Sequence, residues 1–190
     1  MNKILLTLAA AMAICLTACA QNKEKRNMET TTPRTLVAYF SATGTTAKVA
    51  RQIAGITGGT LYEITPQEAY TAADLDWNDK HSRSSVEMSN PQSRPELKES
   101  QTPDVAAYDM VFIGYPIWWD QAPRVINTFI ERHDLKGKTL IPFATSGGSG
   151  ISHSVSTLKT TYPDLNWQEG KLLNHTDSNS LGEWVKSYQK

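Results

Sequence analysis

One stretch of the sequence limits the possible folds of this chain more than any other. The apolar residues 36–40 are followed by six small or hydroxylated residues, 41–46, and a helical pattern begins at Ala47. This order predicts a β-strand, a tight loop and an α-helix in immediate succession. We therefore expect the rest of the domain to be organised around this unit.

The loop 41–46 has the composition of an anion-binding site. A helix start leaves backbone N–H groups unpaired and carries the positive end of the helix dipole, so it can hold a phosphate without a lysine or arginine. The loop lacks the Gly-Lys-Ser/Thr ending of triphosphate loops and the three glycines of dinucleotide loops, so a monophosphate ester is the better candidate. In the alternative interpretation, its hydroxyl groups only cap an ordinary helix. The candidate phosphate-binding residues are Ser41, Ala42, Thr43, Gly44, Thr45 and Thr46.

The N-terminus is typical of an export signal. Lys3 precedes the stretch 4–16, which is apolar apart from one threonine and too short to span a bilayer. The stretch ends in Leu-Thr-Ala-Cys, which resembles the bacterial lipobox, so we expect residues 1–18 to be removed and Cys19 to be lipidated. The alternative is cleavage within residues 18–20, Ala-Cys-Ala, which would release a soluble protein. In the first interpretation the protein is lipid-anchored in the bacterial cell envelope, on its periplasmic or surface face.

Composition excludes several kinds of site. Both cysteines, Cys15 and Cys19, lie in the signal region, so the mature domain has no disulfide, no thiol nucleophile and no cysteine-based metal site. Residues 19–34 are polar and unpatterned, and they predict a flexible tether ahead of a domain over 35–190. A formal net charge of zero gives no indication of nucleic acid as a partner. The four histidines lack the spacing of metal ligands, so we predict no metal site, and we assign no catalytic side chain.

The remainder of the chain alternates between strand and helix patterns. Strands are predicted at 36–40, 61–64, 109–114, 140–144 and 167–173. Helices are predicted from Ala47 up to Gly58, from Pro123 through Ile130, and over 180–188. A further helix is predicted after the fourth strand and its loop, ending at about Thr161. Five strands that alternate with helices indicate a parallel sheet covered on both faces.

The segment 65–103 is an unusually long connection between the second and third strands. Its first half could contain a helix, within 70–88, on which Leu75, Trp77 and Val86 face inward. Its second half has three prolines and is predicted to be irregular. Two interpretations are open: a decorated crossover with a long loop, or a flap that borders the functional site.

Two further loops follow the third and fourth predicted strands. Trp118 and Trp119 offer flat surfaces for stacking an aromatic ring system, and Pro116 stiffens the approach. The loop 145–150 has two adjacent glycines, which let backbone N–H groups come close to ring carbonyls and nitrogens. In an open α/β sheet, ligands bind outside the C-terminal strand ends, so these loops and the loop 41–46 should meet one ligand. The candidate ring-binding residues are Pro116, Ile117, Trp118, Trp119, Thr145, Ser146, Gly147, Gly148 and Gly150.

Together, the three loops match the parts of flavin mononucleotide (FMN): a phosphate, a flat tricycle and a polar ring edge. The sequences of 41–46 and 114–119 resemble the phosphate loop and the aromatic loop of flavodoxins. The segments Asp-Trp-Asn-Asp, Ser-Arg and Arg-Pro within 65–103 strengthen the resemblance to short bacterial flavodoxin-like proteins, which covers about residues 35–188. Asp120 could accept a hydrogen bond near the ring or cap the helix that follows it.

The resemblance implies a flavodoxin-like three-layer α/β sandwich for residues 35–190. Its five-stranded parallel sheet would have the strand order 2-1-3-4-5, with helices on both faces. The resemblance also implies that the ribityl phosphate of FMN binds at 41–46, that the isoalloxazine ring lies beside 116–119, and that the pyrimidine end of the ring meets 145–150. Which of the two adjacent tryptophans stacks on the ring is left open.

The expected function is that of an FMN-binding electron-transfer protein, tethered to a membrane outside the cytoplasm, with an unknown protein or small molecule as redox partner. One alternative is an FMN-dependent reductase of quinones or nitro compounds that uses a nicotinamide donor, with residues 65–103 shaping a substrate pocket. Another is a non-catalytic flavin-binding module. Oxidation of NADH or NADPH by a quinone without a second protein would identify the enzyme. A redox titration in which the bound flavin could not be reduced and reoxidised would identify the non-catalytic module.

Overall fold

The computed structural model describes three ranges of residues: 32–98, 103–174 and 177–189. From Thr32 onward the chain forms one compact unit with its own core. The expected signal peptide 1–18, the lipidation site Cys19 and nearly all of the tether 19–34 lie outside the described residues. Among the helices in the described ranges, none is both long and apolar enough to cross a bilayer.

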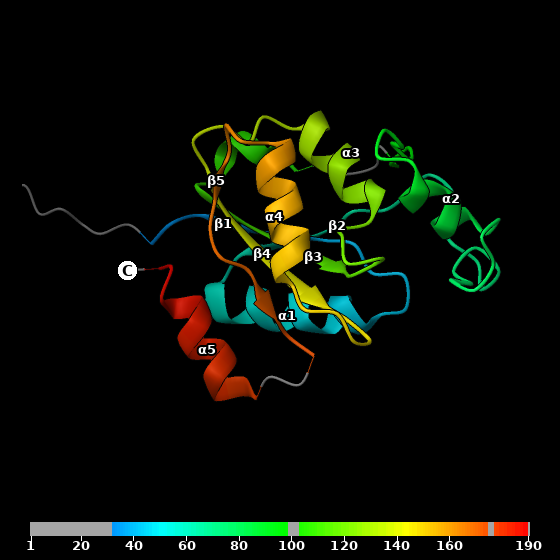
Figure 1. Ribbon diagram of the computed structural model, residues 1–190. Helices are drawn as coiled ribbons and strands as arrows, with labels where there is room; N and C mark the ends of the chain where they lie inside the picture. Colours follow the sequence, from blue (N-terminus) through cyan, green and yellow to red (C-terminus); the bar gives the residue numbers. More distant parts are fainter. Residues whose placement is uncertain (1–31, 99–102, 175–176, 190) are drawn as a thin grey trace, which may run out of the picture. The chain divides into compact units, whose positions relative to one another are not determined.

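A parallel β-sheet forms the centre of the domain (Figure 1). The strands lie in the order β2-β1-β3-β4-β5, which confirms the predicted order 2-1-3-4-5. A short sixth strand, β6, also pairs with β4. The strands are β1 (Thr35–Tyr39), β2 (Thr60–Glu63), β3 (Met110–Pro116), β4 (Thr139–Thr145), β5 (Asn166–Trp167) and β6 (Lys171–Leu172).

The fifth predicted strand, 167–173, is broken into the two short strands β5 and β6. Gln168 N–H donates to Leu140 O at 2.8 Å, and the next bond of a parallel ladder would come from the N–H of residue 142. Residue 142 is proline, which has no N–H, so the ladder is interrupted at that point. Pairing resumes where Phe143 meets Lys171.

Helices cover both faces of the sheet. They are α1 (Thr45–Thr57), α2 (Arg83–Ser89), α3 (Arg124–Arg132), α4 (Ser152–Thr161) and α5 (Ser178–Lys186), with a short 3-10 helix η1 (Val105–Ala107). The start of α1 lies two residues before the predicted start at Ala47, so the last two threonines of the β1 loop form part of its first turn. Gly58, in a left-handed conformation with a φ of 65°, ends α1 as the sequence predicts.

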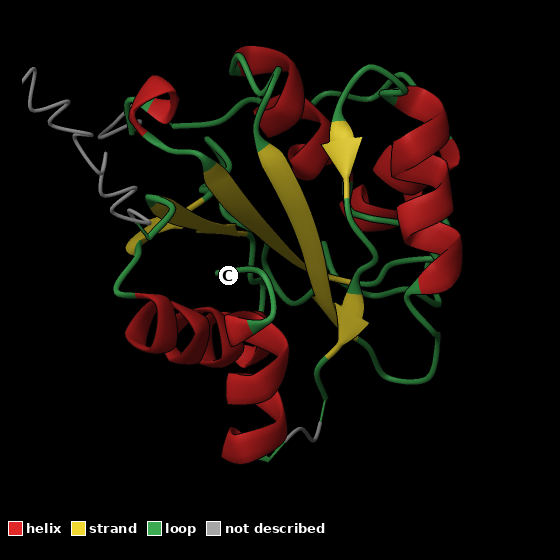
Figure 2. Ribbon diagram, turned by 90° about the vertical axis from the view of Figure 1, so that its left-hand side faces the viewer, coloured by secondary structure: helices red, strands yellow, loops and turns green. Residues whose placement is uncertain are grey.

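Alternate side chains of the central strands point to opposite faces of the sheet. Leu36 and Ala38 of β1 belong to one buried cluster, together with side chains of α3 and α4. Val37 belongs to the other cluster, together with side chains of α1 and α5. Both views of the ribbon show these helices on the two sides of the sheet (Figure 1, Figure 2). The helices therefore leave the C-terminal edge of the sheet free to carry a site.

A glycine allows the sheet to pack tightly beneath that edge. The aromatic ring of Phe143 lies directly over Gly114, and a Cβ atom added to Gly114 would be 2.1 Å from Phe143 Cζ. No side chain can occupy that space without displacing the buried ring. Position 114 in β3 is therefore restricted to glycine by its close contact with the Phe143 ring of β4.

The segment between β2 and β3 is less helical than its pattern predicts. Only α2 is helical within 70–88, and the residues before it form successive turns. The prediction that Trp77 and Val86 face inward is wrong, since these side chains are 73% and 53% exposed. Residues 90–98 are irregular, as their prolines predict.

Short polar side chains explain why the helix starts late. Asp74 Oδ2 accepts a hydrogen bond from Thr71 N–H at 2.8 Å, and Asp79 Oδ1 accepts one from His81 N–H at 2.8 Å. Such side-chain bonds give the backbone an alternative to the helix. Helical bonding begins only after Ser82, whose Oγ caps the first turn of α2.

Candidate functional site

The loops that follow β1, β3 and β4 lie side by side at the C-terminal edge of the sheet. Backbone hydrogen bonds join them in pairs: Phe40 N–H donates to Gly114 O at 2.9 Å, and Ile117 N–H donates to Thr145 O at 2.8 Å. The three strands are neighbours in a parallel sheet, so their C-terminal ends share one edge. The structure thus brings together the three loops in which the sequence predicts ligand-binding residues.

The loop after β1 presents an open helix N-terminus. Gly44 has a φ of 85° and lets the chain turn sharply into α1. No side chain of the described residues caps α1, and the first turn of the helix has no acidic residue. The alternative in which the loop hydroxyl groups cap an ordinary helix is therefore wrong.

The four hydroxyl side chains of this loop have different surroundings. Ser41 Oγ is buried and has no hydrogen-bond partner among the described residues. Thr43 and Thr45 are exposed, with their Oγ1 atoms 3.5 Å apart. Thr46 is 1% exposed, and its Oγ1 lies 2.8 Å from Thr145 Oγ1. Thr43 and Thr45 are therefore open to a ligand, and Ser41 keeps a buried hydroxyl group without a partner among the described residues. Thr46 instead joins the β1 loop to the end of β4.

We call the first of two adjoining pockets the phosphate-side pocket. It has a volume of about 390 Å³ and reaches from the β1 loop to the β4 loop. Every residue that lines it except Asn174 is predicted from the sequence. Five predicted residues line neither pocket: Ser41, Gly44, Thr46, Gly148 and Gly150. The lining residues are Thr43, Thr45, Pro116, Ile117, Trp118, Thr145, Ser146, Gly147 and Asn174.

Asn174 fixes the conformation of the β4 loop. Ser146 N–H donates to Asn174 Oδ1 at 2.7 Å, and Asn174 Nδ2 donates to Ser146 O at 2.6 Å. Ser146 Oγ in turn accepts from Gly148 N–H at 3.1 Å and from Ser149 N–H at 2.8 Å. These bonds set the shape of the loop before any ligand binds. No sequence pattern points to this role, because Asn174 lies 28 residues after Ser146 and beyond β6.

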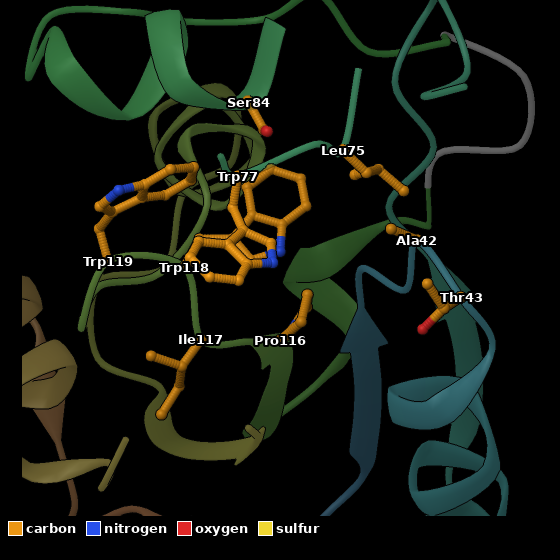
Figure 3. Close-up of a pocket in the computed structure, with 9 residues that line it drawn as sticks. All are labelled: Ala42, Thr43, Leu75, Trp77, Ser84, Pro116, Ile117, Trp118 and Trp119. Carbon is orange, nitrogen blue, oxygen red and sulfur yellow. The ribbon is translucent and has the colours of Figure 1, made fainter. Parts of the chain in front are cut away.

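The second pocket, which we call the tryptophan pocket, adjoins the first along the β3 loop. It has a volume of about 360 Å³, and its outer walls come from the segment between β2 and β3. In Figure 3, Leu75 and Ser84 lie across the pocket from Ile117. The lining residues are Ala42, Thr43, Leu75, Trp77, Ser84, Pro116, Ile117, Trp118 and Trp119.

The two adjacent tryptophans of the β3 loop have unlike surroundings. Trp118 packs edge-on against Phe40 and Tyr70, with ring centroids 5.6 Å and 5.3 Å away. Trp119 is 45% exposed. Trp118 lines both pockets, whereas Trp119 lines only the tryptophan pocket.

A tight turn holds Trp119 at the rim. Trp118 N–H donates to Gln121 O at 3.0 Å, and Gln121 N–H donates to Trp118 O at 2.9 Å. Trp119 and Asp120, between them, both have left-handed backbones, with φ of 46° and 59°. For a residue other than glycine, this backbone conformation costs about 1–3 kcal/mol, and such residues are concentrated at functional sites. Asp120 is exposed and does not cap α3, whose N-cap is Pro123.

A partly buried polar cluster lies behind Trp118. The hydroxyl of Tyr70 donates to Glu87, and Arg83 Nε donates to the other carboxylate oxygen of Glu87 at 2.6 Å. The guanidinium carbon of Arg83 lies 4.1 Å from the centre of the Tyr70 ring. Burial, and then the hydrogen bond to Glu87, raise the pKa of Tyr70 far above its usual range. Tyr70 is therefore a neutral hydrogen-bond donor to Glu87. Its ring packs against Trp118, which connects the segment before β3 to the β3 loop.

The sequence contains part of the signal for this cluster. Arg83 and Glu87 are four residues apart and form an ion pair along α2. The spacing does not identify Tyr70 as the third member, since that residue lies in the irregular chain before α2. Within the described ranges, no three His, Cys, Asp or Glu side chains are grouped so that they could hold a metal ion.

Comparison with known families and structures places the chain among flavin-related proteins. A family model described as flavodoxin matches residues 34–188. A candidate flavoprotein from Bacteroides eggerthii is 61% identical, with a TM-score of 0.79, and the match covers 82% of this chain and 97% of that one. A second, from Bacteroides uniformis, is 57% identical, with a TM-score of 0.78, over 82% of this chain and 99% of that one. A search of curated proteins found no match.

A more distant structure shows the same fold. The flavoprotein of Lactobacillus acidophilus, solved in complex with FMN, is 22% identical, with a TM-score of 0.62, over 80% of this chain and 98% of that one. The match covers nearly the whole of each of these three solved chains.

Proposed function

Because this chain belongs to the flavodoxin family, we propose that its domain binds FMN between the loops that follow β1, β3 and β4 and carries electrons. The location is part of the same proposal: a lipid on Cys19 would tether the domain to a membrane outside the cytoplasm. The redox partner, a protein or a small molecule, would meet the domain there, and the membrane would be contacted through the lipid anchor only.

One observation carries the FMN assignment: the β1 loop offers polar groups that the described residues leave unused. Ser41 Oγ is buried without a partner, and the first turn of α1 has no side-chain cap. A buried hydroxyl left unpaired costs about 1–3 kcal/mol. The oxygens of a phosphate ester would accept hydrogen bonds from Ser41 and from the first N–H groups of α1, and the helix dipole would favour their negative charge.

The rest of the phosphate-side pocket fits a flat ring with a polar edge. Ile117 and Trp118 supply an apolar wall, while Ser146 and Gly147 supply backbone groups for the ring edge. We assign the stacking role to Trp118, since Trp119 does not line this pocket. Bound FMN would supply reversible electron-transfer chemistry, and these residues would bind and orient it.

A pair of ligands tests the phosphate assignment. Thr43→Leu puts a bulky apolar side chain in the β1 loop, so FMN should bind at least tenfold more weakly, while riboflavin, which lacks the phosphate, should bind as before. Thr45→Leu should act in the same way. Thr60→Leu changes an exposed threonine at the start of β2, away from the loop, and should alter neither affinity. Equal losses for FMN and riboflavin in the loop variants would overturn the assignment.

The tryptophan pocket favours a second candidate function, an FMN-dependent reductase of quinones or nitro compounds. This pocket shares Ile117 and Trp118 with the phosphate-side pocket, so a small molecule there would lie close to the proposed flavin site. Steady-state oxidation of NADH or NADPH by the FMN-loaded domain with a quinone separates the two functions. Turnover without a second protein supports the reductase, and its absence supports the carrier.

A further inference from the structure

The side chain of Trp77 is unusually exposed for its type, and it stands on a hydrogen-bonded turn. It is 73% exposed, although a tryptophan gains more than most side chains from burial. The turns around it are fixed by Asp76, whose Oδ1 accepts from Asn78 N–H at 3.0 Å, and by Asp79 N–H, which donates to Asp76 O at 3.1 Å. A large apolar ring carried outside the core on a hydrogen-bonded turn indicates an interaction surface.

The tryptophan pocket beneath this ring has a distinct chemistry. Three of its walls are the side chains of Trp77, Trp118 and Trp119, and Leu75 adds a fourth apolar wall. Among the described residues that line it, none is ionisable, and Thr43 and Ser84 provide the side-chain hydroxyl groups. Such a lining favours flat apolar rings with one or two hydrogen-bonding groups.

The absence of charged side chains from the described lining argues against ionic ligands. An anionic ligand would lose its hydration in the pocket without gaining a cationic partner there. A cationic ring would lose its hydration in a pocket whose described lining has no carboxylate. The pyrophosphate of a nicotinamide dinucleotide therefore fits this pocket poorly.

The tryptophan pocket and the phosphate-side pocket are neighbours with different outer walls. Both include Thr43, Ile117 and Trp118. Only the phosphate-side pocket reaches Asn174, and only the tryptophan pocket reaches Trp77. The two pockets can therefore hold two ligands side by side, each in contact with residues that the other does not reach.

We propose that the tryptophan pocket is a second binding site, which takes a neutral, planar aromatic molecule while FMN occupies the phosphate-side pocket. This inference rests on the proposed function, because it assigns the flavin to the other pocket. Trp77 and Trp119 cover the faces of the aromatic molecule, and Ser84 donates a hydrogen bond to an oxygen on its edge. The pocket should therefore bind flat, uncharged aromatic molecules more tightly than charged ones.

The binding experiment uses the domain from Thr32 onward, which has no cysteine that a quinone could modify. FMN affinity is measured first, and the FMN-loaded domain is then dialysed to equilibrium against each of three bicyclic probes. The probes are menadione (2-methyl-1,4-naphthoquinone), 1,4-naphthoquinone-2-sulfonate and the 1-methylquinolinium cation. Menadione and the sulfonate differ mainly in the charge at one ring position. Menadione should bind at least tenfold more tightly than either charged probe.

Variants locate the bound probe. Trp77→Ala removes an exposed ring and should weaken menadione binding about tenfold while leaving FMN affinity unchanged. Val86→Ala changes another exposed apolar side chain, on α2 but outside the pocket lining, and should change neither affinity.

Several results would overturn this inference and leave the proposed function intact. These are FMN binding without menadione binding, equal binding of menadione and a charged probe, and menadione binding that Trp77→Ala does not weaken. Displacement of menadione by FMN, or loss of FMN affinity in Trp77→Ala, would show that the flavin itself occupies the tryptophan pocket. Failure of the wild-type domain to bind FMN would instead contradict the proposed function.

Discussion

The two pockets on either side of Trp118 are built in different ways. The phosphate-side pocket is made from loops that leave adjacent strands, and short bonds such as Thr46 Oγ1 to Thr145 Oγ1, at 2.8 Å, join these loops directly. The tryptophan pocket depends on the segment between β2 and β3, which is attached by a few polar links, such as the bond from Arg124 Nη2 to Met88 O at 2.9 Å. The Tyr70, Arg83 and Glu87 cluster holds this segment together internally. The sheet thus fixes the proposed cofactor site, while a separate segment shapes what lies next to it.

This difference predicts that damage to the sheet edge should have the largest effect and should disturb both pockets. Gly114→Ala would force a methyl group against the Phe143 ring, so the free energy of unfolding should fall by about 1–3 kcal/mol. Urea titration measures the change. Gly55→Ala, in α1 with open space around it, should raise stability by about 0.5–1 kcal/mol. If Gly114→Ala were as stable as the wild type, the tight packing under the edge would be refuted.

Strain at the start of α1 should act on phosphate binding in the phosphate-side pocket. Gly44→Ala places a side chain at a φ of 85°, which costs about 1–2 kcal/mol and misaligns the start of α1. FMN should then bind about tenfold more weakly relative to riboflavin, and menadione should bind the FMN-saturated domain as before. Calorimetric titration measures these affinities.

Gly137 provides the matched control for that variant. Its φ is 74°, and it lies between α3 and β4, away from both pockets, so Gly137→Ala should carry a similar strain. Stability should fall by about 1–2 kcal/mol with no change in the ratio of FMN to riboflavin affinity. A changed ratio in Gly137→Ala would mean that general destabilisation, rather than the loop, controls phosphate binding.

Loss of the Glu87 charge should loosen only the tryptophan pocket. Glu87→Gln keeps the shape of the side chain but weakens its bonds to Arg83 and Tyr70, so stability should fall by about 1–2 kcal/mol. Hydrogen exchange should increase around α2, and menadione affinity should fall while FMN affinity stays constant. The exposed Glu96 is the control, since Glu96→Gln should leave all three quantities unchanged. Weaker FMN binding in Glu87→Gln would show that the two pockets are not independent.

The smallest effect concerns pH and a second link to the same segment. Arg94 Nε donates to Glu131 Oε2 at 2.8 Å, and this bond holds the pKa of Glu131 below its usual value of 4.5. Since the folded-state pKa is depressed, the stabilisation is present above pH 4.5 and is lost as the pH falls through the folded-state value.

Glu131→Gln should therefore reduce stability near neutral pH by about 0.5 kcal/mol or less, because the pair is partly exposed to solvent. The difference between wild type and variant should shrink as the pH is lowered below 4.5. Urea titrations at several pH values measure this difference. A gap that widened on acidification would have the wrong sign and would refute the depressed pKa.

The sequence predicts features that depend on neighbouring residues. The apolar run and the abrupt loop after it define β1 and the start of α1 to within two residues, because strand pattern and loop composition act locally. The order of the strands follows from the resemblance and is confirmed. The three loops meet because parallel strands end at one edge, whereas FMN binding at those loops stays a prediction.

The features that the sequence missed depend on distant or competing contacts. Asn174 shapes the β4 loop from 28 residues away, and no spacing rule connects it with Ser146. The inward helix face expected within 70–88 fails at Trp77, because aspartate side chains bind the backbone and stabilise turns in place of helix. The fifth strand breaks because a proline in β4 cannot donate the bond that would continue it.

The central claim is that neutral hydroxyl and N–H groups of the β1 loop hold the phosphate of FMN. Calorimetric titration of the wild-type domain with FMN and with riboflavin, under one set of conditions, tests it most directly. The account predicts that FMN binds at least 100-fold more tightly, because the phosphate adds several charge-assisted hydrogen bonds. Equal affinity for the two flavins would contradict it.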